Sequence, residues 1–533
     1  MRFFNATNML MACLLLCTSV VAQTYYVSSS ASGGGVGTEK DPLTLVEAFS
    51  KARAGHTYWV KAGNYGAAQL NLMVSGTQEN PIIFEGYRDK PGDLQSTSSC
   101  SICTTTEPDT AIAPTLTGTT TDGSPDQDQG IRISGAFIHF KNFAFRYYNR
   151  PFESSGSNNQ ISNLYIFQPG NHNVAEVAQY LFSPAFPNGG YTGYGLRLQG
   201  DGIQVRNSRV VNAGAEGVRL TNSKKPRLQN IEVICTTGKG VYTNHASADG
   251  NITDYHFLLG HDTADGIFEN ITITNPEGAV YPGHGFAVKP LEGKGATNHL
   301  IDGFTVTNTL IETQFPDTQY IVFRNGEINS TDTDARREIH GARIANASQF
   351  ITIENTVFNG ARFMSWGWDE ALFASEYQYA ARDVALLNCL FNNTNDTPYS
   401  AFAIAFNFPR NTYLTENITI DHVTVYNYYY LWETSKPNKN IRLSNLVVDG
   451  IKQFNVKRGP GQQYPLDADF TNSNFSNGIT PPQGSGITRK APLFADPSNG
   501  DFTLGNSDLL KSSLPTPNFE GDLDIGFLKN REQ

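Results

Sequence analysis

A six-residue pattern recurs through the middle of the chain: an apolar residue, any residue, Asn, any two residues, and an apolar residue. Its copies are FKNFAF (140–145), ISNLYI (161–166), VRNSRV (205–210), LQNIEV (228–233), FENITI (268–273), IDGFTV (301–306), FRNGEI (323–328), IENTVF (353–358), LLNCLF (386–391), IDHVTV (420–425) and LSNLVV (443–448). The third residue is Asn in all but two, namely at 142, 163, 207, 230, 270, 325, 355, 388 and 445. Successive copies are mostly 21 to 34 residues apart. Two longer steps, of 40 and 44 residues, are expected to hold an extra coil or a loop.

This period predicts a solenoid of stacked coils and not a string of separate domains. An Asn at a fixed turn tolerates the left-handed backbone conformation, and its amide can bond to the Asn above and below. Leucine-rich repeats also carry an Asn ladder, but they need many leucines and a tighter period. We therefore predict an all-β fold, a right-handed parallel β-helix of about twelve coils.

The two ends of the repeat region predict how the solenoid is closed. Asp41 and Pro42 precede apolar residues at helical spacing, including Leu45 and Phe49, which predicts an N-capped helix of about three turns. Such a helix would cover the open end of the core. We expect the β-helix with this cap to span 23–454, and residues 455–533 to form a C-terminal coil or tail packed on it.

The first 22 residues have one Arg, an apolar run and small residues before Gln23, which predicts a secretory signal peptide at 1–22. A lipoprotein anchored at Cys17 is the alternative. No later apolar run approaches a membrane span, so we expect a secreted, periplasmic or extracellular protein and no membrane partner. Removing Arg2 lowers the formal net charge of −11 by one further unit. An acidic protein is a poor general binder of nucleic acid, and we expect a monomer.

Cys100 and Cys103 are the only closely spaced cysteines of the mature chain. No second Cys pair or His pair completes a zinc-type site with them. In an exported protein the spacing favours a short-loop disulfide.

A second pattern, Gly followed by alternating apolar residues, precedes many of the Asn units. It reads GIRIS (130–134), GLRLQ (195–199), GVRLT (217–221), GVYTN (240–244), GFAVK (285–289) and GARIA (341–345). Residues on alternate positions of a strand point to opposite sides, so one set faces outward. The outward set is Arg132, Arg197, Arg219, Tyr242, Ala287 and Arg343, followed two residues later by Ser134, Gln199, Thr221, Asn244, Lys289 and Ala345. The residues before each glycine are Gln129, Tyr194, Glu216, Lys239, His284 and His340.

Stacked at the strand spacing of about 4.8 Å, these residues predict a basic ladder on an acidic protein. Like charges at this spacing repel unless an anion lies over them, so a polyanionic glycan with carboxylates or sulfates fits the face. The alternative is that the arginines are solvated or paired with neighbouring carboxylates such as Glu216. His284 could equally be a turn residue, and Lys289 could merely end a strand before Pro290.

Trp366 and Trp368, followed by Asp369 and Glu370, form a second candidate. Aromatic faces bind sugar rings and carboxylates serve acid/base chemistry. The alternative is that these indoles pack beside an insertion.

Some stretches resemble known proteins. The motifs GHTYWVKAGNYG…ENPIIFEGY (from 55 and 79) and APLFADPSNGDFTL…DIG (from 491 and 524) resemble the first and last segments of secreted bacterial β-helix proteins of the pectate-lyase-like superfamily. The motif HGFAVK, with HLIDGFTVTNT after it, is similar to a coil of family 9 pectate lyases. This resemblance implies a carbohydrate-active enzyme that uses Ca²⁺. The chain departs from it, with His284 in the place of an Asp and no Asp cluster for the ion.

The leading hypothesis is a polysaccharide lyase acting on an acidic glycan. In such a reaction a base removes the C5 proton, positive groups neutralise the C6 carboxylate, and the C4 oxygen leaves. We expect Lys289 to be the base, Arg219 or Arg343 to bind the carboxylate, and His284 or His340 to shuttle a proton. Arg197, Glu216, Lys239, Tyr242, Trp366 and Trp368 are the expected substrate-binding residues. Lys289 should lie two coils from either arginine, roughly 10 Å away by the strand spacing.

Two other classes of function stay open. A glycoside hydrolase of a sulfated or acidic galactan would need two carboxylates at a defined separation. The acids available for this are Glu216, Asp201, Glu338, Asp369 and Glu370. A non-catalytic glycan-binding surface protein would have the same repeat and the same cap, because a fold does not fix a function.

Overall fold

The computed structural model describes 22–121, 124–170, 193–236, 255–277, 283–290, 295–331, 340–366, 379–393, 402–408, 414–434, 438–455, 466–476, 480, 482–499 and 501–504. The expected signal peptide therefore lies almost wholly outside the described residues. Among the described residues no helix is long and apolar enough to cross a membrane.

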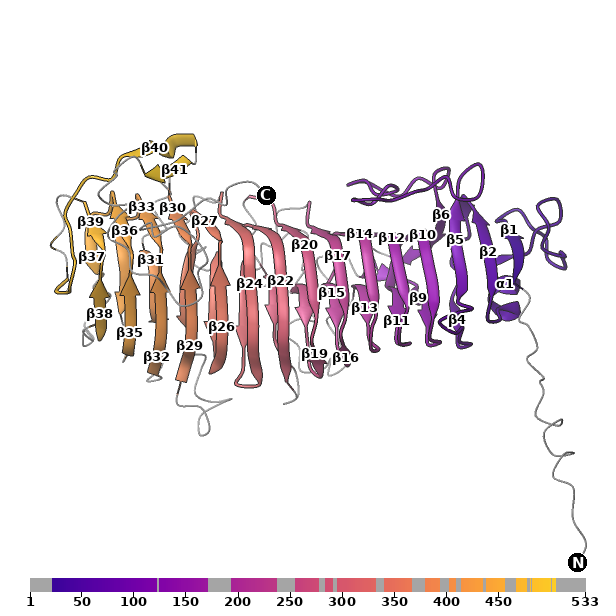
Figure 1. Ribbon diagram of the computed structural model, residues 1–533. Coiled ribbons are helices and arrows are strands. Elements are labelled where there is room, and N and C mark those ends of the chain that lie inside the picture. The colour runs from indigo at the N-terminus through magenta and orange to yellow at the C-terminus, as the bar shows by residue number, and fades with distance from the viewer. Residues whose placement is uncertain are drawn as a thin grey trace, which may run out of the picture.

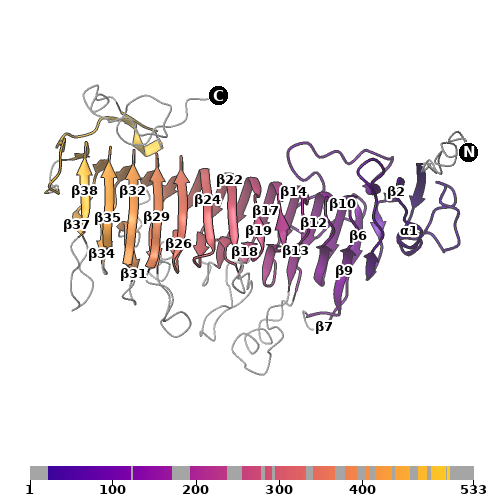
Figure 2. The same ribbon diagram turned by 60° about the horizontal axis from the view of Figure 1, so that its bottom comes forward.

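Two long parallel sheets wind around one core and form a parallel β-helix, as predicted (Figures 1 and 2). Sheet 1 has 24 strands: β1 (Gln23–Val27), β2 (His56–Lys61), β3 (Gly63–Asn64), β5 (Ile82–Tyr87), β6 (Pro114–Thr117), β10 (Ile138–Arg146), β12 (Gln160–Phe167), β14 (Gln204–Val211), β16 (Ser223–Lys224), β17 (Arg227–Ile234), β19 (Thr263–Ala264), β20 (Ile267–Thr274), β22 (Ala296–Thr307), β24 (Thr318–Asn329), β26 (Ser348–Glu354), β27 (Val357–Asn359), β29 (Tyr379–Leu387), β30 (Leu390–Asn392), β32 (Leu414–Asp421), β33 (Thr424–Tyr426), β35 (Asn438–Ser444), β36 (Val447–Asp449), β38 (Ala468–Thr471) and β39 (Asn474–Phe475).

Sheet 2 has 13 strands: β4 (Leu70–Leu72), β9 (Gln127–Ile133), β11 (Tyr148–Ser154), β13 (Tyr194–Leu198), β15 (Glu216–Leu220), β18 (Tyr255–Leu259), β21 (His284–Val288), β23 (Leu310–Gln314), β25 (Gly341–Ala345), β28 (Arg362–Trp366), β31 (Phe402–Phe408), β34 (Tyr430–Thr434) and β37 (Gln453–Asn455). The remaining strands are β7 (Thr120–Thr121), β8 (Ser124–Pro125), β40 (Phe494–Asp496) and β41 (Asp501–Leu504). In Figure 1 the strands lie side by side along the long axis, from the indigo end to the yellow end.

One coil shows how the sequence pattern makes the core. Strands β26, β27 and β28 follow one another around the solenoid, and the alternate residues Ile351, Ile353, Phe358 and Phe363 are fully buried between the sheets. Because each coil adds the same kind of apolar residues to the same core, the buried residues form one continuous cluster along the molecule.

The Asn ladder stands where the repeat predicts it. All nine asparagines of the six-residue unit have positive φ, between 49° and 67°. The Asn163 amide donates to Asn142 Oδ1 at 2.8 Å, and that of Asn388 donates to Asn355 Oδ1 at the same distance. Where the unit lacks Asn, Gly303 and His422 adopt the same conformation, with φ of 67° and 52°. The ladder marks a corner at which sheet 1 bends.

The N-terminal end is covered by a helix, but this helix is shorter than expected and begins later. Helix α1 (Leu45–Lys51) has Thr44 as its N-cap, in a capping box with Glu47. Asp41 is therefore not the cap, and the predicted helix of about three turns was too long. Leu45, Ala48 and Phe49 are buried against the core, and Phe49 lies 4.7 Å from Phe84 between ring centroids.

The two long steps of the repeat contain no extra coil. Strand β12 pairs directly with β14 across the step of 44 residues, and β17 pairs directly with β20 across the step of 40. Of the two expectations for these steps, an extra coil is therefore wrong.

The C-terminal part continues the sheet past residue 454. Strands β38 and β39 pair in parallel with β35 and β36. Beyond them, η2 (Pro497–Asn499) and the antiparallel pair β40–β41 fold back over the outside of the solenoid (Figure 1, yellow). The ring centroids of Phe502 and Tyr426 lie 5.2 Å apart there.

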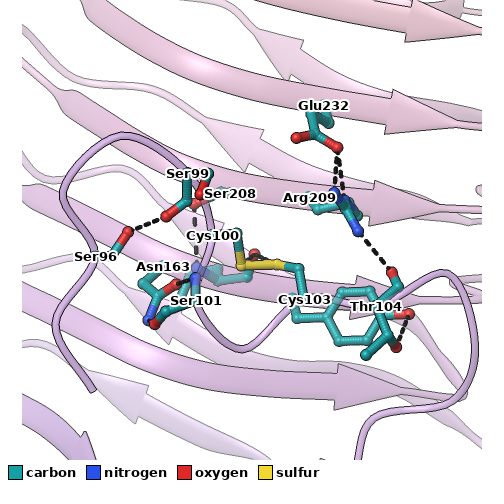
Figure 3. The surroundings of a disulfide bond; sticks show 12 residues. Ser96, Ser99, Cys100, Ser101, Cys103, Thr104, Asn163, Ser208, Arg209 and Glu232 are labelled. Carbon is teal, nitrogen blue, oxygen red and sulfur yellow. Dashed lines mark hydrogen bonds and ion pairs between the residues drawn. A yellow bond between two sulfur atoms is a disulfide. The ribbon is translucent and has the colours of Figure 1, made fainter. Parts of the chain in front are cut away.

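Cys100 and Cys103 form the predicted disulfide, in a long connection between β5 and β6 that lies on sheet 1 (Figure 3). The backbone N–H of Ser101 donates to Asn163 Oδ1 at 2.7 Å, and the Asn163 amide donates to Ser101 Oγ at 2.8 Å. The Asn207 amide donates to the carbonyl of Ser96. The disulfide segment thus bonds to two rungs of the Asn ladder.

Candidate functional site

The outward face of sheet 2 carries the predicted candidate residues, and the strand register fixes their order. One row along the stack is Tyr194, Glu216, Tyr255 and His284, on β13, β15, β18 and β21. A second row, three residues further along each strand, is Arg197, Arg219, Leu258, Ala287, Glu312 and Arg343. Lys289 follows β21 directly. We call these strands, β13 to β25, the charged face.

The predicted basic ladder is interrupted, because two rungs differ from those expected. The strand between β15 and β21 is β18, of sequence YHFLL, so the GVYTN segment at 240–244 does not fill this rung. Lys239 and Tyr242 lie outside the described residues. The glycine at the start of the pattern misled the alignment, since β18 has no leading glycine.

The second rung is β23, of sequence LIETQ, which also lacks the glycine and was not recognised in the sequence. It lies between β21 and β25, so two strand steps separate His284 from Arg343 and also from Arg219. This agrees with the expected separation of Lys289 from either arginine. Strand β23 contributes Glu312 to the second row, a carboxylate on a rung that the predicted ladder lacked. The available signal in the sequence was the acidic residue that follows Leu310 and Ile311.

Glu312 joins two of the predicted residues in a buried cluster. Its Oε2 contacts His284 Nδ1 at 2.5 Å, and its Oε1 accepts from Arg343 Nε at 2.5 Å. Glu312 is fully buried, and His284 and Arg343 are 6% and 4% exposed. Burial alone would raise the pKa of the Glu312 carboxyl, but the charges of Arg343 and His284 and their hydrogen bonds hold this pKa below its ordinary value.

This cluster fixes the orientation of the His284 ring. A contact of 2.5 Å between Nδ1 and a carboxylate oxygen requires the proton on Nδ1, so the ring donates to Glu312. Arg343 Nη2 lies 3.1 Å from the same nitrogen. A carboxylate that orients a histidine in this way fixes the ring tautomer, here with a hydrogen on Nδ1.

Tyr255 connects His284 to Lys289. The Tyr255 and His284 rings stack with their centroids 4.6 Å apart and an interplanar angle of 16°. Lys289 Nζ donates to the Tyr255 hydroxyl at 2.7 Å, and it lies 5.4 Å from the centroid of the Tyr255 ring. Lys289 is partly exposed at the end of its strand, and Tyr255 contacts both its amino group and the histidine ring.

The arginines of the N-terminal part of the face are paired with carboxylates, as the alternative interpretation expected. Arg219 Nη1 is 3.3 Å from Glu216 Oε1, and Arg197 Nη1 is 3.7 Å from Glu153 Oε1. Both arginine side chains keep 21–23% of their surface exposed. Arg343, in contrast, is buried on Glu312. The uniformly positive surface of the prediction is therefore replaced by a mixed row of ion pairs and apolar residues.

The other predicted residues are not brought into this cluster. His340 is buried, and its Nδ1 bonds to Ser330 Oγ at 2.8 Å. The backbone of Trp366 ends β28, opposite Ala345, but its side chain lies outside the described residues. Trp368, Glu338, Asp369 and Glu370 lie outside them as well.

Calcium does not fit the described residues. Ca²⁺ takes six to eight oxygen ligands. In the part of the chain that the structure describes, no group of three or more His, Cys, Asp or Glu side chains could hold a metal ion. Glu312, a described carboxylate beside His284, is itself bound by the Arg343 guanidinium.

Three described carboxylates of sheet 2, those of Glu153, Glu216 and Glu312, stand on strands that are not adjacent. Glu153 and Glu216 are two strands apart, on β11 and β15, and Glu216 and Glu312 are three strands apart. At about 4.8 Å per strand, the strands that carry these residues are about 10 Å and 14 Å apart. Glu338, Asp369 and Glu370, the other acids considered for a hydrolytic pair, lie outside the described residues.

Comparison with known proteins gives resemblances of structure only. No protein-family model matches the chain, and no curated protein sequence matches it. The catalytic domain of a GH87 α-1,3-glucanase in complex with nigerose is similar over 85% of this chain, with 11% identity and a TM-score of 0.41, and the chain spans 64% of its length. A GH87 α-1,3-glucanase from Streptomyces thermodiastaticus is similar over 87% of this chain and 69% of its own, with 14% identity and a TM-score of 0.39.

An alginate lyase from Paenibacillus sp. is similar over 88% of this chain and 99% of its own, with 13% identity and a TM-score of 0.27. Similarity at this level assigns neither a reaction nor a substrate to this chain. The fold and the charged face define the class of molecule: a parallel β-helix protein with a partly exposed lysine, a tyrosine and a buried, carboxylate-bound histidine on one sheet.

Proposed function

We propose that this protein is a secreted polysaccharide lyase that cleaves an acidic glycan by β-elimination. The observation that carries the proposal is the contiguous set Lys289, Tyr255, His284 and Glu312 on the charged face. It combines a surface amine, a phenol and an oriented imidazole, which are the groups that proton abstraction from a sugar carbon requires.

In the proposed reaction the amine of Lys289, in its neutral form, takes the proton from C5 of a uronate. The electron pair of the C5–H bond forms the C4–C5 double bond, the C4–O bond breaks, and the leaving oxygen takes a proton. His284 is the proposed source of that proton, through Nε2, because its Nδ1–H is held by Glu312. No water is consumed, and one product carries an unsaturated sugar at its new end.

Arg219 and Arg197 are proposed to bind substrate carboxylates beside the reacting sugar. Arg219 lies two strands from Lys289, roughly 10 Å by the strand spacing, so it would serve a neighbouring sugar. Arg343 is not assigned this role, because its guanidinium is bound to Glu312 inside the protein. Arg343 instead holds the carboxylate that orients His284.

A hydrolase of an acidic or sulfated galactan is the second candidate, and it depends on Glu338, Asp369 and Glu370. The deciding experiment is an assay of the full chain on polygalacturonate, alginate, hyaluronan, chondroitin sulfate and carrageenan. Reducing ends and ultraviolet absorbance are read in parallel. The proposal expects both signals to rise together on a uronate polymer.

New reducing ends without ultraviolet absorbance would show that the protein is a hydrolase and not a lyase. Binding without any product would assign it to glycan-binding proteins that lack catalysis.

A further inference from the structure

A second corner of the solenoid carries a ladder of its own, separate from the charged face. At this corner one residue of each successive coil has positive φ, between 53° and 67°. In register these residues are Phe137, Asn158, Gly202, Lys225, Asp265, Asn298, Tyr320, Phe350, Asp383, Asn417 and Asn440. Asn, Asp and Gly suit this backbone conformation, because short polar side chains or no side chain relieve its steric cost.

On both sides of its middle, the ladder is held by side-chain hydrogen bonds. The Asn298 amide donates to Asp265 Oδ1 at 2.6 Å. Further along, Asn417 donates to Asp383 at 3.0 Å and Asn440 donates to Asn417 at 2.6 Å. These bonds tie neighbouring coils together, as in the Asn ladder of the six-residue unit.

Tyr320 and Phe350 break this ladder on two consecutive coils. Both are bulky aromatic residues in the left-handed conformation, with φ of 57° and 56°, where such residues are genuine outliers. Neither is hidden in the core: they are 54% and 38% exposed. Their rings stack in parallel, with centroids 4.9 Å apart and an interplanar angle of 5°. Folding alone does not account for this pair, because Asn at both places would avoid the strain and continue the hydrogen bonds.

A groove of about 570 Å³ lies beside the aromatic pair, on the outward face of sheet 1. Its floor includes Leu300 and Val322, and Tyr320 forms part of its wall. Phe350 covers one face of the Tyr320 ring. The other face is directed along the stack toward Asn298, a shorter residue, so the outer part of the ring extends beyond it.

The polar lining of the groove is suited to hydroxyl groups and unsuited to anions. Asp265 and Glu354 contribute carboxylates. Arg324 is already paired with Asp302, at 2.7 Å and 3.0 Å, so its charge is compensated. An apolar floor, an aromatic face and carboxylate acceptors are the elements of a sugar-binding site. The two carboxylates of the lining outnumber its one arginine, which disfavours a uronate or a sulfate.

We infer that this groove is a second glycan-binding site, which takes a neutral pyranose chain with one sugar ring on the face of Tyr320. It lies around the corner from the charged face, on the segment that follows β23, which carries Glu312. The two sites differ in the charge of their ligand. The inference is independent of the proposed reaction, since it concerns binding to other residues.

The test measures binding of cellohexaose, laminarihexaose, maltohexaose and xylohexaose to the full chain by titration calorimetry, at low and high salt. We expect at least one of these neutral hexasaccharides to bind, with an affinity that salt does not change. The double variant Tyr320→Asn with Phe350→Asn should lose about tenfold or more of this affinity. Tyr320→Phe should keep it, because the ring face is retained.

The melting temperature of the same double variant is a second readout. If the two aromatic residues served only to stabilise the fold, their replacement would lower this temperature. Since Asn restores the ladder, the melting temperature should rise, by about 1–3 °C. Phe137→Asn is the matched control: it removes an aromatic residue in the same conformation from a distant rung of the same ladder, and should leave binding unchanged.

Absence of binding by all four hexasaccharides at millimolar concentration would overturn the inference, and so would unchanged binding by the double variant. A fall in the melting temperature together with unchanged binding would assign the aromatic pair to folding. Turnover of an acidic glycan by the double variant is expected to equal that of the wild type. Loss of the proposed lyase activity and loss of neutral-glycan binding are therefore separate observations, and each can occur without the other.

Discussion

The Asn corner of sheet 1 and the charged face of sheet 2 are built from the same coils, yet they follow opposite rules. At the corner the same residue type returns coil after coil, and each amide bonds to the next. On the charged face, successive rungs present a tyrosine, a glutamate, a tyrosine and a histidine. Repetition serves stacking, because identical side chains satisfy one another along the axis. Where the residues differ from coil to coil, a solenoid can place unlike side chains next to one another. A catalytic site requires such a set of unlike side chains.

The largest expected effect on stability is that of removing one partner of a buried ion pair on the charged face. Glu312→Gln removes the carboxylate that compensates Arg343, so we expect a loss of about 3–5 kcal/mol in the free energy of unfolding at pH 7. The control Glu416→Gln breaks the pair with Lys439, whose side chain is 63% exposed, and should have no measurable effect. Urea unfolding compares the two.

The pH dependence of this loss has a defined sign. The pKa of Glu312 is lower in the folded protein than in the unfolded chain, so its contribution is present above the ordinary pKa of glutamate, about 4.3. This contribution is lost as the pH falls through the folded value. The difference between the wild type and Glu312→Gln should therefore narrow below about pH 4. A difference that widens in acid would contradict the ion-pair account.

Two buried histidines should make the stability of the protein depend on pH. Burial lowers the pKa of His256 to about 4 and that of His299 to about 4. Because each is neutral in the folded protein and protonated in the unfolded chain below about pH 6.5, stability should fall by about 2 kcal/mol per histidine between pH 7 and pH 5. His299→Gln should reduce this slope. An unchanged slope in this variant would show that other groups cause the acid sensitivity.

A single rung of the Asn corner should matter less. Asn388→Ala loses the bond to Asn355 and the short polar side chain that makes the left-handed conformation tolerable, at an expected cost of about 1–3 kcal/mol. Asn388→Gly should cost less, because glycine adopts this conformation freely, as Gly303 does on another coil. Thermal unfolding of both variants ranks them, and the reverse ranking would refute the conformational argument.

The smallest effect is expected at the surface of the charged face. Arg219→Ala removes the cation beside Glu216, whose side chain is 10% exposed, so stability should fall by about 1 kcal/mol. Affinity for a polyanionic glycan should nevertheless fall several-fold, and the salt dependence of binding should weaken. Arg206→Ala, on the other sheet, is the control that should change neither quantity. Equal losses in both variants would show only a general effect of net charge.

The sequence was informative where side chains repeat and uninformative where they do not. The Asn corner could be predicted residue by residue, since one residue type recurs at a regular spacing. Strands β18 and β23 were missed because they lack the glycine that marks the other rungs, and with β23 the prediction missed Glu312. The second corner escaped for a related reason: Lys225, Asp265 and Tyr320 share a conformation and not a chemical type.

The sequence left the pairing of charges open between substrate groups and carboxylates of the protein such as Glu216. The alternation of residues placed Arg197, Arg219 and Arg343 correctly on one face. Whether an outward arginine meets substrate or a carboxylate of the protein depends on which residue the neighbouring coil brings opposite it. That in turn depends on the lengths of the connections between coils, which no periodic pattern fixes.

The central claim is that Lys289, beside Tyr255 and His284, is the base of an elimination reaction. The most direct test measures product absorbance and glycan binding for the wild type, Lys289→Ala and Lys289→Arg on the uronate polymer that the wild type degrades. Lys452→Ala is the matched control, because Lys452 lies over the Tyr429 ring at the same 5.4 Å, far from the charged face. Both Lys289 variants should lose about 10²-fold or more in rate and retain binding, since arginine keeps the charge but cannot accept a proton at neutral pH. An active Lys289→Ala enzyme, or saturated products from the wild type, would contradict the claim.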